Sequence, residues 1–342
     1  MEFHMPMKPY AAGRYQLDIP EPSTLAGWGR QDVTQLGTAR VFPDISQRKF
    51  QKMAQDRVAE LKSVSKNFER FVSDTSLDTV PAGKGTLLEK YVEGPLPNEW
   101  NVLFWDDDGI KSDFCKSETY YWLQDPKKLP GDGVGYCFDS DFSANASKQQ
   151  NEMKDIANGL SLIRLRGDND EMPEGTGFCF QRAFVPYEVP TKGEVPFEAI
   201  STEWRLKNHT DVVISLYTQG APKVKPEGLI ARSKRAGGPP FQGIRSRKRT
   251  IDEYPGEEVV LNAKDENGTS GFNAMWEFEG GNEKDLIKPF IMVQMFSGHG
   301  DKDPVNSSLS EKEFLAMWDA ILASFHWRGP KPGTASRAPT QP

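Results

Sequence analysis

Two apolar runs and the helical pattern that follows them decide the architecture of this chain. The runs are GFNAMWEF, residues Gly271–Phe278, and PFIMVQMF, residues Pro289–Phe296. Their length and apolar content predict two strands. After a polar loop, apolar residues recur at helical spacing: Phe314, Leu315, Met317, Trp318, Ile321, Leu322 and Phe325. We therefore predict a helix lying across a sheet, which is a packed scaffold and not an active site.

Both ends of this helix carry sequence signals. Ser310 and Glu313 have the spacing of a capping box, in which each side chain accepts a hydrogen bond from a backbone N–H at the helix start. Leu309 and Phe314 occupy the hydrophobic staple positions on either side of that cap. Gly329-Pro330 predicts the helix end.

Composition bounds the class of protein. The chain has 342 residues, of which 37% are hydrophobic and 27% charged, as in ordinary globular proteins with room for two domains. Its apolar runs are much shorter than the ~20 residues that a membrane-spanning helix needs. A net charge of −7 argues against a nucleic-acid ligand and leaves a basic or neutral protein partner open.

The cysteines and the start of the chain leave the compartment open. The spacings of Cys115, Cys137 and Cys179 match no zinc or redox motif. One disulfide with a spare buried thiol and three reduced core cysteines are both compatible with the residues. A signal peptide is not visible, but Met1–Met5 (MEFHM) resembles an engineered start that could have replaced one.

Strand and helix patterns occur on both sides of a charged segment, Gly167–Gly175 (GDNDEMPEG), which is typical of a linker. The patterns before it predict strands at 13–20, 39–42, 86–92, 100–105 and 117–123, and amphipathic helices at 50–71 and 147–166. Those after it predict further strands at 177–185, 197–206, 212–217 and 257–263. We predict an α+β protein of two domains, residues 10–168 and 172–330, each a largely antiparallel sheet with packed helices.

The search for catalytic chemistry gives one weak candidate. His299 and Asp301 lie in the loop Gly298-His299-Gly300-Asp301 and could serve a hydrolase or a small-ligand site. A Gly-x-Ser-x-Gly elbow, a Walker loop, a dinucleotide fingerprint and a His-Glu-x-x-His helix are all missing from the sequence, which disfavours a cofactor enzyme. The acidic turn 106–109 lacks the Glu of a calcium loop, since Cys115 stands at that position, so we predict no metal site.

Several short motifs together resemble a known family. They are Gly13-Arg14-Tyr15 with Asp18-Ile19-Pro20, Pro173-Glu174-Gly175 with Gly177-Phe178-Cys179-Phe180, Pro255-Gly256-Glu257-Glu258, Trp276-Glu277, and Leu309-Ser310 with Trp318–Ser324. In this order and spacing, the chain is similar to the immunity proteins that accompany class-four lipase effectors of type VI secretion. The resemblance implies a two-domain periplasmic protein that binds a toxic phospholipase and blocks it, by covering its entrance or holding its lid. It implies no enzymatic activity, cofactor or small-molecule substrate.

Two exposed segments are the predicted contacts with such a partner, because aromatic and arginine side chains anchor most interfaces. In the first domain they are Trp105, Asp106, Asp107 and Asp108. In the second they are Arg232, Lys234, Arg235, Arg245 and Arg247, within a basic run that continues through Lys248 and Arg249. A solvated hairpin is the alternative interpretation of that run.

Overall fold

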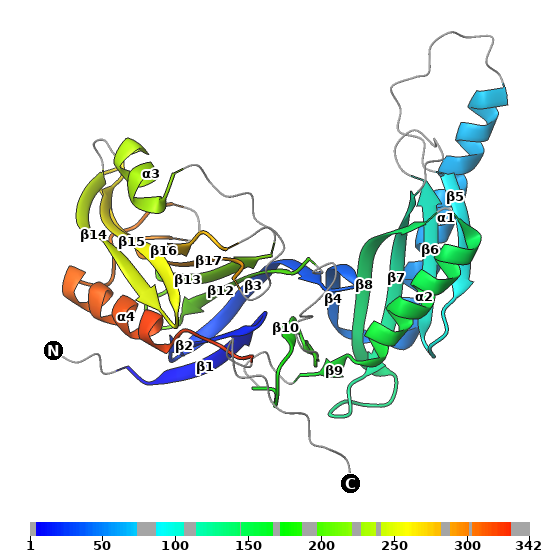
Figure 1. The fold of residues 1–342 in the computed structure, drawn as a ribbon, viewed down its shortest axis with the longest axis horizontal. Helices are drawn as coiled ribbons and strands as arrows, with labels where there is room; N and C mark the ends of the chain where they lie inside the picture. The colour runs from blue at the N-terminus through cyan, green and yellow to red at the C-terminus, as the bar shows by residue number, and fades with distance from the viewer. Residues whose placement is uncertain are drawn as a thin grey trace. The chain divides into compact units, whose positions relative to one another are not determined.

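The chain forms two compact units (Figure 1). The computed structural model describes residues 5–73, 87–105, 114–143, 145–166, 172–186, 197–220, 227–236, 241–281, 288–300 and 303–329. Unit 1 combines Met1–Gln31 with Arg166–Pro342, and unit 2 is Asp32–Leu165. The first strands of the chain thus belong with its second half.

This division differs from the predicted domains, which placed residues 10–31 with the first half of the chain. Strand β1 (Met7–Ala12) pairs with β2 (Tyr15–Pro20), and β2 also pairs with β18 (His326–Trp327), more than 300 residues later. Strand β3 (Ser23–Val33) is the neighbour of β12 (Ala199–Leu206) in the main sheet of unit 1. Strand pairing between segments that are distant in the chain has no local sequence signal, so it could not be predicted. The proposed linker 167–175 lies partly outside the described residues.

Unit 1 is built on a sheet whose strand order is β14-β15-β16-β17-β13-β12-β3. The further elements of this unit are β10 (Phe178–Phe180), β11 (Ala183–Val185), β13 (Val213–Gln219), α3 (Leu229–Ala236), β14 (Phe241–Ile251), β15 (Tyr254–Lys264), β16 (Ser270–Phe278), β17 (Phe290–Phe296) and α4 (Glu311–Ser324). Neighbouring strands from β12 to β17 pair antiparallel. The strand predicted at 177–185 is instead the short hairpin β10–β11, which turns at Arg182 with a positive φ of 60°.

The predicted strand–strand–helix unit is confirmed. Strands β16 and β17 pair antiparallel from Asn273↔Phe296 to Phe278↔Ile291, and α4 buries its apolar face. The helix begins after the Ser310 cap, and both hydrogen bonds of the capping box are present. Its predicted end was wrong, because α4 stops at Ser324 and Phe325 is extended. The chain leaves the helix early because His326–Trp327 forms β18 against β2.

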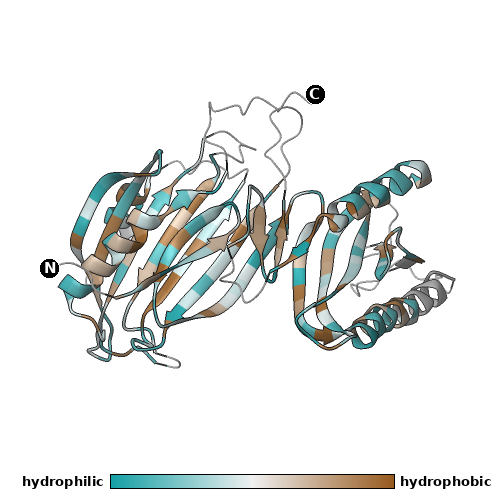
Figure 2. Ribbon diagram, turned by 90° about the horizontal axis from the view of Figure 1, so that it is seen from below, coloured by the Kyte–Doolittle hydropathy of each residue, from teal (hydrophilic) through white to brown (hydrophobic). Residues whose placement is uncertain are grey.

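Unit 2 contains a sheet with a helix on each face, as Figures 1 and 2 show. Its elements are β4 (Gly37–Ser46), α1 (Gln47–Ser73), β5 (Leu87–Glu93), β6 (Glu99–Trp105), β7 (Phe114–Gln124), β8 (Asp132–Ser143), α2 (Ala146–Ser161) and β9 (Arg164–Leu165). The strand order is β4-β8-β7-β6-β5, and all four neighbouring pairs are antiparallel. The two predicted amphipathic helices are α1 and α2.

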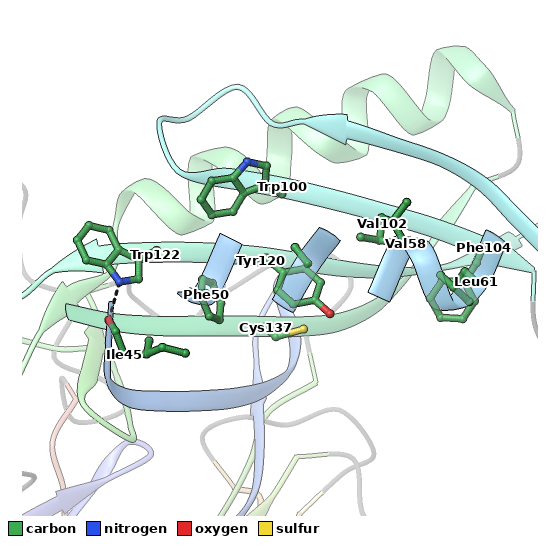
Figure 3. Close-up of a cluster of buried hydrophobic side chains, with 11 residues drawn as sticks. Ile45, Phe50, Val58, Leu61, Trp100, Val102, Phe104, Tyr120, Trp122 and Cys137 are labelled. Carbon is green, nitrogen blue, oxygen red and sulfur yellow. Dashed lines mark hydrogen bonds between the residues drawn. The ribbon is translucent and has the colours of Figure 1, made fainter. Parts of the chain in front are cut away.

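The core of unit 2 lies between α1 and one face of this sheet (Figure 3). Its members are Ile45, Phe50, Ala54, Val58, Leu61, Trp100, Val102, Phe104, Tyr120, Trp122 and Cys137. Trp122 Nε1 donates to the carbonyl oxygen of Ile45 at 3.0 Å, so its one polar atom is satisfied. Gly135 gives Phe50 room, because a Cβ there would lie 2.4 Å from the ring. Apolar residues three or four apart on α1 thus pack against strand residues that alternate onto the same face of the sheet.

These findings confirm the α+β fold class. Cys115, Cys137 and Cys179 are all free and buried, which agrees with three reduced core cysteines and not with a disulfide. Within the described residues, the helices are too short or too polar to cross a membrane.

Candidate functional site

The structure describes only one residue of the contact predicted in the first half of the chain, Trp105. Trp105 ends β6 and is only 4% exposed, so the prediction that it lies on the surface is wrong. It is buried because β6 runs between β5 and β7, and all seven of its residues are buried. Asp106, Asp107 and Asp108 lie outside the described residues.

The basic residues of helix α3 pair with acidic side chains of unit 1. Arg232 contacts Glu277 at 2.5 Å and Glu279 at 3.3 Å, and Glu277 is almost fully buried. Arg235 pairs with Glu227 at 2.7 Å in an exposed contact, and Lys234 is exposed. Arg232 therefore holds α3 onto the sheet, while Lys234 and Arg235 remain on the surface.

The arginines of β14 form a larger network. Arg245, Arg247 and Arg249 occupy alternate positions of the strand, so their side chains share one face of the sheet. That face carries Glu258 of β15, which is fully buried and accepts hydrogen bonds from all three guanidinium groups at 2.5–3.1 Å. Trp318 Nε1 of α4 donates to the same carboxylate at 2.7 Å.

A second carboxylate, Asp319, completes this network from helix α4. It accepts from Arg245 Nη1 and Nη2, both at 2.9 Å, and from Arg249 Nη1 at 2.6 Å. Arg245 and Arg249 have side chains 19% exposed, against 48% for Arg247. Only Arg247 of the three thus presents much of its side chain to solvent, and the three arginines of β14 belong mainly to an internal ion-pair network.

The pKa values of the two carboxylates agree with their ion pairs. Burial alone would raise the pKa of Glu258, but hydrogen bonds from Arg247 and Trp318 and the charges of Arg245 and Arg249 outweigh it and hold this pKa below its ordinary value. The pKa of Asp319 is also lowered, since its bonds to the same arginines exceed the effect of burial. Both carboxylates are therefore ionised at neutral pH.

Two of the motifs that carry the family resemblance, around Gly13-Arg14 and Cys179, lie in a second buried network in unit 1. Gly13 and Cys179 exchange backbone hydrogen bonds at 2.7 and 2.8 Å, which joins the two Gly-containing motifs. Arg14 makes a two-pronged contact with Glu198 at 2.8 and 2.9 Å, and both side chains are buried. The backbone N–H of Arg328 donates to the carbonyl oxygen of Arg14 at 2.9 Å. These motifs therefore stabilise the fold of unit 1. The sequence alone does not show this role, because the contacts join distant segments.

His299 lines a hollow of about 320 Å³ in unit 1, with Phe272, Phe296 and Val305 among its neighbours. Its backbone N–H donates to the carbonyl oxygen of Asp211. The Asp211 carboxylate accepts from the backbone N–H groups of Gly298 and Ser308 at 2.9 and 3.0 Å. Burial acts to raise its pKa, but hydrogen bonds from the Ser308 side chain and from these two N–H groups outweigh burial and lower the pKa. The loop is thereby fixed to the sheet. Asp301, the proposed catalytic partner, lies outside the described residues.

A larger hollow of about 460 Å³ lies at the turn between β14 and β15, lined by Tyr254, Phe278 and Trp327 among others. Asp252 and Glu253 form this turn with positive φ angles of 41° and 74°. Asp252 Oδ2 accepts the backbone N–H of Trp327 at 2.6 Å, so the turn holds β18 in place. Among the described residues, no cluster of His, Cys, Asp and Glu could hold a metal ion.

Comparison with known proteins gives a specific match for the second half of the chain. Residues 171–330 match the family described as Tle cognate immunity protein 4 C-terminal domain. The resemblance to class-four lipase immunity proteins is thereby confirmed. No curated protein sequence matches the chain.

Solved structures with the same fold extend over nearly the whole chain. One is a Tle4–Tli4 complex, at a TM-score of 0.66 and 17% identity, covering 96% of this chain and 99% of that one. Another is the apo immunity protein TplEi of the type VI secretion system from Pseudomonas aeruginosa, at a TM-score of 0.64 and 16% identity, covering 94% and 97%. TplEi complexed with an "L" peptide has a TM-score of 0.61 and 16% identity, covering 95% of this chain and 99% of that one. The fold of the immunity proteins thus includes both units.

Proposed function

We propose that this chain is an immunity protein that binds a type VI lipase effector and inhibits it without chemistry of its own. The observation that carries the proposal is the match of residues 171–330 to an immunity-protein domain. The likeness of the whole fold to a chain of a Tle4–Tli4 complex supports it. We propose the periplasm as its location, where a secreted lipase would meet the membrane of the cell that it attacks.

The mechanism we propose is steric. A lipase admits an acyl chain by moving a lid or cap, so a protein that holds this element, or covers the entrance, stops turnover. Stable complexes of this kind bury ~1,600 Å² in total. Two compact units in one chain can each supply part of this area, and once one has docked the other binds at high effective concentration, which raises affinity by ~10²–10⁴.

Protection of cells tests the proposal. Cells that export the cognate lipase should lose viability, and co-export of the chain should restore it. Chain retained in the cytoplasm should not protect, because the two proteins then stay apart. Failure of the exported chain to protect would contradict the proposed function.

One variant separates this function from a hydrolase or ligand-binding role of the His299 loop. His299→Ala should protect cells as well as the unaltered chain, because the bond that fixes this loop to Asp211 uses the backbone of His299. A variant that folds, as judged by its melting temperature, and yet fails to protect would favour the alternative role.

A further inference from the structure

The loop between β7 and β8 in unit 2 is braced by side-chain hydrogen bonds and carries an exposed leucine. Leu129 is 75% exposed, the highest value among the large hydrophobic residues that the structure describes. The neighbouring residues Lys127, Lys128 and Pro130 are also exposed. A single exposed leucine is common on protein surfaces. The construction of the loop that carries Leu129 is what distinguishes it.

One side chain braces this loop from inside. Gln124 Nε2 donates to the carbonyl oxygens of Asp125, Leu129 and Asp132 at 2.9, 3.1 and 2.7 Å. Gln124 Oε1 accepts from the backbone N–H of Gly131 at 2.8 Å. Asp125 Oδ1 accepts from the N–H of Lys127 at 2.9 Å. Side-chain hydrogen bonds therefore tie the loop backbone together although its tip faces solvent.

A second irregular segment lies beside the loop. Strand β4 changes register against β8 between Phe42 and Ile45, and Asp44 there has a positive φ of 61°. Pro43 and Asp44 are exposed, and Asp44 pairs with Lys128 of the loop. Bulges of this kind re-aim a strand and are frequent next to functional surfaces. We call the exposed residues 126–130, with Pro43 and Asp44, the loop–bulge surface.

At and beside the loop–bulge surface, exposed basic side chains outnumber the exposed carboxylate of Asp44, which pairs with Lys128. Helix α1 starts beside the loop, since the backbone N–H of Gln47 donates to the carbonyl oxygen of Gly131 at 2.9 Å. Its next two residues, Arg48 and Lys49, are exposed, and the first turn carries no acidic residue. Cations at a helix start are disfavoured by the helix dipole, so folding does not account for their position. A partner with carboxylates around an apolar recess would complement this surface.

We propose that the loop–bulge surface is where unit 2 contacts the lipase, with the Leu129 side chain in an apolar recess that has an acidic rim. This inference rests on the proposed function. A braced loop loses little conformational entropy on binding, so the burial of Leu129 contributes to affinity almost in full. Leucine is less common than Trp, Tyr or Arg among the residues that dominate interfaces, so its contribution depends on a well-packed pocket that excludes water.

Calorimetric titration of the purified lipase with full-length variants tests this contact. Leu129→Ala should weaken binding at least about tenfold, the loss expected when most of one leucine side chain is no longer buried. Leu129→Asp should weaken it further, because a carboxylate would enter an apolar recess with an acidic rim. Lys127→Glu should lower the association rate and the dependence of that rate on salt. All three variants should melt at the temperature of the unaltered chain, since the altered side chains are exposed.

Phe114→Ala is the matched control. Phe114 is 60% exposed and begins β7, the strand that Gln124 ends. The eleven residues of that strand separate it from the loop by about 30 Å. Its substitution should change the affinity less than twofold.

The outcomes separate the two proposals. If the unaltered chain binds and inhibits the lipase while Leu129→Ala and Leu129→Asp bind equally well, the loop–bulge contact is overturned and the proposed function stands. If Phe114→Ala alone weakens binding, the contact lies at the other end of β7. If the unaltered chain does not bind the lipase at all, both proposals fail.

Discussion

Replacing Glu258 with alanine should lower the free energy of unfolding by about 3–5 kcal/mol, the usual cost of removing one partner from a buried ion-pair network. Glu258 is fully buried and accepts hydrogen bonds from three arginines and from Trp318. Without it, Arg245 and Arg249 keep only Asp319 as a partner in this network, and the indole N–H of Trp318 loses its acceptor. Urea unfolding followed by tryptophan fluorescence measures the change.

Glu266→Ala is the control for this measurement, because Glu266 is exposed in the turn between β15 and β16. It should shift the free energy of unfolding by less than about 0.5 kcal/mol, as is usual for surface sites. A loss below about 1 kcal/mol for Glu258→Ala would contradict the network described here.

The same network gives stability a definite pH dependence. The folded-state pKa values of Glu258 and Asp319 are lowered, so the ionised forms stabilise the native chain. This stabilisation is fully present above the unfolded-state pKa values, near 4, and is lost as pH falls through the lower folded-state values. Stability should therefore fall below about pH 5, and Glu258→Gln should fall less steeply over that range, because it has one carboxylate fewer to protonate.

Replacing Arg14 with methionine should have an effect of similar size. Arg14 is 3% exposed and its partner Glu198 is 5% exposed, so the substitution removes the two-pronged guanidinium contact from a buried carboxylate. We expect a loss of about 3–5 kcal/mol in the free energy of unfolding. Arg14 also stacks its guanidinium 5.8 Å from the centre of the Trp327 ring, so β18 should loosen from β2.

A double variant distinguishes a buried charge from lost packing. Arg14→Met with Glu198→Met should recover a large part of the stability, because well-packed apolar pairs replace buried ion pairs at little net cost. Lys207→Met, an exposed position in the same unit, should have little effect. If the double variant is no more stable than Arg14→Met, the uncompensated charge is not the cause of the loss.

Local sequence signals were sufficient for many of the elements, but not for β3, β8 and α3, and not for the units. The capping box at Ser310 and Glu313 and the apolar periodicity after it are short-range features, so α4 and the strands before it could be predicted. The end of α4 could not, because the chain leaves the helix to pair with β2 at the other end of the sequence. The placement of residues 10–31 in unit 1 depends on the same long-range pairing.

The candidate contact residues could not be predicted for the same reason, because their partners are distant in the chain. The arginines at 245, 247 and 249 formed a charge run because Glu258 and Asp319, which balance them, come later in the chain. Their two-residue spacing was a strand signal that pointed to one shared face. Leu129 stands in Lys127-Lys128-Leu129-Pro130, an ordinary turn composition, and its exposure depends on the brace from Gln124 that only the folded loop shows.

Titration of the lipase with the purified chain, followed by phospholipid hydrolysis, tests the central claim most directly. We predict that activity falls linearly with added chain and reaches its floor at a fixed molar ratio, because a tight complex forms and the chain has no turnover of its own. The chain alone should release no fatty acid. Undiminished hydrolysis with the chain in molar excess, or hydrolysis by the chain alone, would contradict the account.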